Sequence, residues 1–218
     1  MRNVKECIKN LKKLATVDVN TALSCYYTII SEGKPVTGVS VRFAELVVYC
    51  WGNITAGARI IDKSERHIII EGFAKDNETN NESTVQLLQP IINSNGSLMN
   101  DSTRTTKSNA TSSIAYRNAV FKIIPSAVLH SAETHITNYI IKNYDVDIEK
   151  DVTKFFEEKG ISKEELIEKL KLSENYSIDI RQIMFLVGVK NALIEGDSTI
   201  EEMFQPKTRK TKFEKAFD

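Results

Sequence analysis

The chain has 218 residues, is 41% hydrophobic and 27% charged, and carries 29 basic and 29 acidic side chains. This composition is ordinary for a soluble globular protein, and no apolar run approaches the roughly 18 residues that span a bilayer, so we expect no membrane segment. Three widely spaced cysteines without a C-x-x-C pair predict reduced thiols. The lysine-bearing start, residues 1–13, lacks the apolar core of a signal peptide, which predicts a cytoplasmic protein.

The zero net charge is an average over three unlike segments. Residues 1–145 carry 16 basic and 13 acidic side chains, residues 146–206 carry 8 and 14, and residues 207–218 carry 5 and 2. The segment charges are therefore +3, −6 and +3. We predict an α+β body over residues 1–145, an acidic helical module over residues 146–206, and a flexible basic tail over residues 207–218.

Hydrophobic periodicity and turn residues predict the elements in chain order. Apolar residues at helical spacing predict a first helix over residues 1–14. Residues 22–30 are rich in β-branched and aromatic side chains and predict a strand that ends in a turn at residues 31–33. Ser40 is a suitable N-cap for a helix over residues 41–50.

Three strands and a long helix are predicted next. Polar connectors join the strands, which we place at residues 54–61, 66–75 and 83–92. They predict an antiparallel meander with one face buried by helices. The long helix begins at Thr103 or Ser108 and is ended by Pro125.

The remaining chain is predicted to be helical, with an acidic hinge at residues 145–149. The expected helices cover residues 126–142, 152–159, 162–172 and 177–194. Ser162 and Glu165 have the spacing of a capping box. The predicted fold class is α+β: a small antiparallel β-meander packed by a long central helix and followed by an all-helical C-terminal module.

The long helix has one basic side. No Asp or Glu occurs over residues 102–132, and at 100° per residue one side carries Arg104, Lys107, Thr111, Asn118 and Lys122. A basic helix laid against a sheet could follow a nucleic-acid backbone, whereas periodicity alone favours a solvated helix face. Arg117 falls within the apolar stripe of this helix, where it needs a carboxylate, a neighbouring subunit or a phosphate as partner.

No motif for catalysis is complete. The chain lacks G-x-S-x-G and H-E-x-x-H, and Lys34 has no upstream glycine of a phosphate-binding loop. His130 and His135 are five residues apart, which does not place them on one helix face. A metal-dependent nuclease would draw on the carboxylates Asp62, Glu71, Asp76 and Glu78, although exposed turn residues are the favoured interpretation. We expect no enzyme, no metal and no cofactor.

Several blocks carry a resemblance to a known family. They are residues 38–46 (GVSVRFAEL), 50–53 (CWGN), 56–59 (AGAR), 109–119 (NATSSIAYRNA) and 194–204 (IEGDSTIEEMF). Over about residues 20–206 the chain resembles the phage-encoded Erf/RecT-type single-strand annealing proteins, and the NATSSIAYRNA block is the most specific part.

This resemblance implies a β-meander with a long helix packed across it, assembled as a homo-oligomeric ring or filament. It implies that single-stranded DNA lies in a basic groove with its bases outward, so that a complementary strand pairs without ATP during homologous recombination. A phage exonuclease or a host single-strand binding protein is the expected partner. By position, the expected DNA-binding residues are Arg42, Arg59, Arg104, Lys107, Arg117 and Lys122.

One departure from the family pattern weakens the expected groove. Basic residues crowd the last strand of the family, whereas residues 87–90 here are LLQP. The main alternative is a non-enzymatic interaction module of phage replication or recombination, whose acidic C-terminal helices dock another protein. A metal-dependent nuclease is the weaker alternative.

Overall fold

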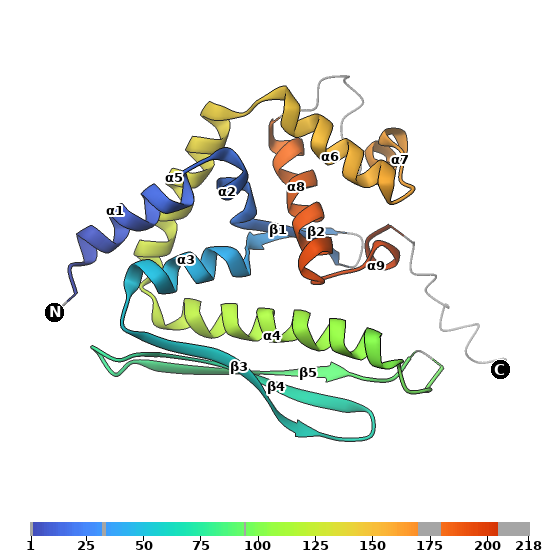
Figure 1. Cartoon of the computed structure of the whole chain (residues 1–218), viewed down its shortest axis with the longest axis horizontal. Coiled ribbons are helices and arrows are strands. Elements are labelled where there is room, and N and C mark those ends of the chain that lie inside the picture. Colours follow the sequence, from blue (N-terminus) through green and yellow to red (C-terminus); the bar gives the residue numbers. More distant parts are fainter. Residues whose placement is uncertain (1, 32–33, 94, 170–179, 205–218) are drawn as a thin grey trace.

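The computed structural model describes residues 2–31, 34–93, 95–169 and 180–204 (Figure 1). The chain begins with two helices, a hairpin and a third helix: α1 (Val4–Ala15), α2 (Val19–Ser24), β1 (Tyr26–Ser31), β2 (Lys34–Val39) and α3 (Val41–Trp51). Side-chain caps start the helices, because Asn3, Asp18 and Ser40 each accept a hydrogen bond from a backbone N–H of the first turn.

A three-stranded antiparallel meander follows, in the order β3-β4-β5. Its strands are β3 (Ile54–Lys63), β4 (His67–Asp76) and β5 (Glu82–Pro90), with a bulge in β3 between Ile60 and Asp62. The long helix α4 (Asp101–Ile123) crosses one face of this sheet, as Figure 1 shows. The predicted meander with a long helix packed across it is therefore confirmed.

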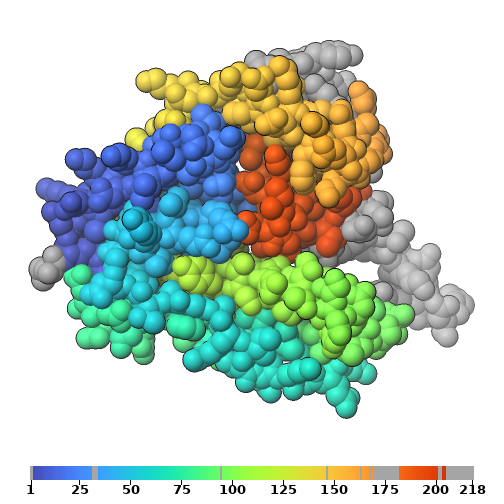
Figure 2. All heavy atoms as spheres, viewed as in Figure 1, coloured from blue at the N-terminus to red at the C-terminus, as the bar shows by residue number. Residues whose placement is uncertain are grey.

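The helix lies directly on the middle strand. The buried residues of β4 toward α4 are Ile68, Ile70, Gly72 and Ala74. A Cβ atom at Gly72 would overlap the backbone carbonyl of Ala115, so only glycine permits this approach. The sheet and α4 form two layers, and the other helices lie on the far side of α4 (Figure 2).

The C-terminal half is helical and shares its core with the first half. It contains α5 (Ser126–Asn143), α6 (Val146–Glu158), α7 (Lys163–Lys169), α8 (Ile180–Glu195) and α9 (Ile200–Phe204). The Asn191 side chain of α8 donates hydrogen bonds to the carbonyls of Leu23 and Tyr26 at 3.0 and 2.8 Å. One continuous cluster of buried apolar residues runs from Leu11 to Phe204. Among the described helices, none combines the length and apolarity needed to cross a bilayer.

Two element boundaries and one additional strand differ from the sequence predictions. Residues 22–24 belong to helix α2, and β1 starts only at Tyr26. Strand β2 was not predicted: it contains Pro35 and Gly38, residue types that are rare in strands, and its first four residues are exposed. Helix α6 begins at Val146, inside the predicted hinge. The predicted flexible tail over residues 207–218 lies outside the described residues.

Candidate nucleic-acid interface

The structure does not bring the six predicted DNA-binding residues onto one surface. Three of them, Arg42, Lys107 and Arg117, converge on the segment that joins α8 to α9. The other three are dispersed. Arg59 lies on the open face of the sheet, Arg104 lines a separate groove, and Lys122 is exposed near the C-terminal end of α4.

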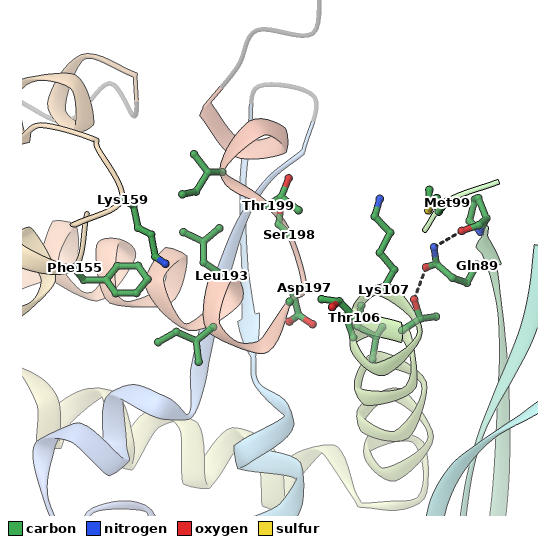
Figure 3. A pocket seen from close by; sticks show the side chains of 17 residues that line it. Gln89, Met99, Thr106, Lys107, Phe155, Lys159, Leu193, Asp197, Ser198 and Thr199 are labelled. Carbon is green, nitrogen blue, oxygen red and sulfur yellow. Dashed lines mark hydrogen bonds between the residues drawn. The ribbon is translucent and has the colours of Figure 1, made fainter. Parts of the chain in front are cut away.

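A cleft of about 670 Å³ lies between the first half of α4 and the C-terminal helices (Figure 3). One wall is α4 with the end of β5, and the opposite wall comes from α6, α8 and the α8–α9 connection. Both walls mix polar and apolar groups: Gln89, Pro90, Met99, Thr106, Lys107, Ala110, Thr111, Ile114, Phe155, Lys159, Leu193, Ile194, Gly196, Asp197, Ser198, Thr199 and Ile200. We call this the α4–α8 cleft.

The lining of the α4–α8 cleft has an excess of positive charge. Its charged side chains are Lys107, Lys159 and Asp197. The Asp197 carboxylate is balanced by the guanidinium of Arg117, with 3.7 Å between Nη1 and Oδ2. In Figure 3 Lys107 stands on α4, and the ammonium group of Lys159 lies beside the Phe155 ring, with Leu193, Asp197 and Ser198 between the two lysines. The two lysines are therefore the charges that a bound anion would meet.

The sequence left three partners open for Arg117: a carboxylate, a neighbouring subunit or a phosphate. The structure supplies a carboxylate. Its side chain and that of Asp197 are each 8% exposed, and the guanidinium carbon lies 4.4 Å from the ring centroid of Tyr27. Burial raises the pKa of Asp197, whereas the charge of Arg117 lowers it. Since Arg117 is enclosed in this way, it supports the cleft from behind and does not line it.

Arg42 is paired on the surface at the same segment. It contacts Glu45 of its own helix and Glu195 at the end of α8, with the closest nitrogen–oxygen distances at 3.1 and 2.9 Å. The Arg42 side chain is half exposed. Exposed ion pairs contribute little stability, so a phosphate could replace the exposed Glu45 carboxylate at small cost, whereas the Glu195 side chain is only 19% exposed.

Arg59 and Arg104 are also paired with carboxylates, away from the α4–α8 cleft. Arg59 donates to Glu71 at 2.8 Å and lies over the ring of Phe73, on the sheet face opposite α4. Arg104 contacts Asp101 in the first turn of α4. It lines a second groove of about 490 Å³, between the start of α4 and the bulged end of β3.

The expected basic track along α4 needs a correction. On the side that carries Arg104, Lys107 and Lys122, the middle of the helix is buried against the sheet: Thr111 donates a hydrogen bond to Gln89 of β5, and Ala115 is fully enclosed. Small side chains allow this polar face to pack closely. Lys107 and Lys122 are consequently separated by about 22 Å of helix, at 1.5 Å per residue, without a continuous exposed path.

Two lysines near the opposite wall were not predicted as binding residues: Lys159, which lines the cleft, and Lys190, which does not. The ammonium nitrogens of Lys159 and Lys190 lie 5.9 and 5.5 Å from the ring centroid of Phe155. Phe155 and Lys159 have the i, i+4 spacing that places two residues on one helix face, which was a usable local signal. Their position opposite α4 depends on tertiary packing and left no trace in the sequence.

The carboxylates considered for a nuclease have structural partners or lie apart. Asp76 accepts two hydrogen bonds from Arg2 and one from the Trp51 indole. Glu71 accepts from Arg59 and Gln86. Within the described ranges, no group of three His, Cys, Asp or Glu side chains is arranged to hold a metal ion.

Comparison with protein-family models found no match, and neither did searches of curated proteins and of solved structures.

Proposed function

We propose that the chain is a single-stranded DNA-binding and annealing protein of a phage or prophage, which acts as a homo-oligomer without ATP. The observation that carries the proposal is the cationic α4–α8 cleft beside the long helix of the meander. The sequence resemblance implied both this core and a basic groove. The proposed role needs no catalytic residue, because base pairing supplies the specificity and driving force of annealing.

The lining of the cleft suits a single strand. Ammonium groups neutralise phosphates, and hydroxyl or amide groups such as those of Thr106, Ser198 and Gln89 hydrogen-bond to phosphate and sugar oxygens. Apolar side chains along the same walls accommodate bases without reading them. In this proposal Lys107 contacts the strand, Arg42 exchanges a carboxylate for a phosphate, and Arg117 is a positioning residue.

The sheet edges support assembly into a ring or filament. In the described structure β3 and β5 each pair on one side only, which leaves both outer edges without a strand partner. Large apolar side chains are exposed close to these edges, with Ile60 58% and Leu88 62% exposed. Unpaired edges and exposed apolar groups both favour pairing with another copy of the chain. A phage exonuclease or a host single-strand binding protein would act on this assembly in the cytoplasm.

The substitution K107E tests the proposal. We expect wild-type protein to bind a labelled 30-nucleotide strand in a salt-dependent manner, and we expect K107E to bind at least tenfold more weakly, since it removes one phosphate contact and adds repulsion. Fluorescence anisotropy measures both affinities. K142E is the matched control, because Lys142 is exposed in the last turn of α5. Equal losses in the two variants, or no binding by wild type, would contradict the proposal.

A protein-interaction module remains the second candidate. The observation that favours it is the pairing of Arg42, Arg59, Arg104 and Arg117 with carboxylates, which removes much of the predicted positive surface. Deleting residues 146–218 does not separate the two candidates, because α8 belongs to the shared core. The K107E comparison does separate them, since a module that binds only proteins retains no labelled strand in either form.

A further inference from the structure

We infer that the strand crosses the α4–α8 cleft from Lys107 to Lys159 and Lys190, so that the acidic helical module supplies half of the phosphate contacts. This inference rests on the proposed function and assigns residues to it. It differs from the sequence-based expectation, in which the track followed α4 from Lys107 toward Lys122.

The wall of the cleft opposite α4 contains an aromatic ring with lysines beside it. Phe155 and Lys159 of α6 line the cleft, and Lys190 of α8 lies over the same phenyl ring. Phe155 is itself held by an edge-on contact with the buried Phe156, at 5.3 Å between ring centroids. The ring attracts the ammonium group of Lys159, which lines the cleft, and that of Lys190, which does not line it.

The acidic residues at the end of α8, beside the cleft, are paired with arginines. The module is acidic as a whole, yet the carboxylates at the end of α8 face arginines of the other half: Glu195 pairs with Arg42, and Asp197 pairs with Arg117. These pairs cancel the negative charge at the α8–α9 connection. Lys107 and Lys159 are the basic side chains among the residues that line the cleft.

The packing of α4 against the sheet excludes a path for the strand along this helix. Beyond Lys107 the same side of the helix turns into the sheet at Thr111 and Ala115, both of which are buried. A strand bound at Lys107 must therefore leave α4, and the α4–α8 cleft is the hollow that opens beside this lysine. The cation–π contacts that the lysines would give up are weak when exposed, so exchange for phosphate is favourable.

The double substitution K159Q/K190Q tests the inference by the salt dependence of binding. Each phosphate contact to a single strand contributes about 0.7 to the slope of log affinity against log salt concentration. We expect the slope to fall by about 1.4 and affinity to fall at least tenfold at low salt. K154Q is the matched control, because Lys154 is exposed on α6 and, unlike Lys159 and Lys190, is not recorded over the Phe155 ring. Thermal unfolding of each variant checks that the fold is unchanged.

A further variant removes the ring and keeps the charges. F155L keeps an apolar side chain without the aromatic face that attracts the two ammonium groups, so we expect a several-fold loss of affinity together with a smaller salt slope. K122Q should bind like wild type. A wild-type slope in K159Q/K190Q, together with lost binding in K107E, would overturn the inference and leave the proposed function in place. Absence of wild-type binding would overturn both.

Discussion

The guanidinium of Arg117 lies between the ring of Tyr27 and the carboxylate of Asp197, so α4, β1 and the α8–α9 connection meet at one enclosed charge. Asp197 Oδ1 is enclosed without a hydrogen-bond partner among the described residues. Leaving a buried acceptor unpaired costs about 1–3 kcal/mol, which explains why burial raises the pKa of this group. The pair fixes the α8–α9 connection beside the cleft at some cost to stability.

Asp76 is the residue whose ionisation should govern acid stability. Hydrogen bonds from Arg2 hold the pKa of Asp76 well below its usual range, and bonds from Trp51 and the Glu78 backbone N–H act in the same direction. A lowered pKa in the folded state means that stability is present above the usual value near 3.9 and is lost as the pH falls below it. We expect the free energy of unfolding to decrease between about pH 5 and pH 2.

The substitution D76N should remove much of this pH dependence. At neutral pH it should lower the free energy of unfolding by roughly 3 kcal/mol, because the buried Arg2 loses its closest carboxylate and keeps only Glu78, at 3.8 Å, as an anionic partner. Urea unfolding at a series of pH values measures both effects. D62N is the control, since Asp62 is exposed and accepts only from the Lys63 backbone N–H. A parallel pH profile in wild type and D76N would show that another group controls acid unfolding.

At the scale of elements, the contact of α4 with β4 holds the two layers together. A Cβ atom at Gly72 would overlap the backbone of Ala115 and Tyr116, which cannot move without shifting the whole helix. Overpacking of this kind costs about 1–3 kcal/mol. We expect G72A to lower the free energy of unfolding by at least that amount, as measured by chemical denaturation.

G57A is the matched control on the neighbouring strand. A Cβ atom at Gly57 would lie 2.8 Å from the Phe73 ring, but this ring is partly exposed on the open sheet face and can turn away. Its effect on unfolding should therefore be clearly smaller than that of G72A. Similar losses in both variants would mean that α4 adjusts to the extra methyl group.

The elements that the sequence predicted well are those with strong local signals. Ser40 caps α3 as predicted, and polar connectors separate the three strands of the meander. The long helix was predicted as well, but it begins at Asp101, before the predicted Thr103 or Ser108. Strand β2 escaped prediction because it contains Pro35 and Gly38, residue types that are rare in strands. On the polar side of α4, periodicity could not show that Thr111 and Ala115 face the sheet.

At the scale of the molecule, the predicted site shows the same limit. Residue type and helical spacing selected Lys107, which lines the cleft, and Arg117, which needed a partner. The spacing could not reveal that Glu195 and Asp197, some 80–150 residues away in sequence, pair with Arg42 and Arg117. Nor could it place Lys159 opposite α4. Long-range packing decides which cations remain at the cleft.

The helices that follow residue 145 share their core with the first part of the chain. Residues 1–145 and the helices after them bury one apolar cluster, and the cleft lies between the two parts. The helical module therefore belongs to the candidate site, and removing it would expose the core along α8. Function and stability should consequently be tested by single substitutions in the full chain.

Photocrosslinking tests the central claim most directly. A single strand that carries 5-bromodeoxyuridine is bound to wild-type protein at low salt, irradiated, and the attached peptides are identified by mass spectrometry. We predict crosslinks to the walls of the α4–α8 cleft, at residues such as Met99, Thr106 and Phe155. Crosslinks confined to the open sheet face around Phe73, or no crosslinks at all, would contradict the account.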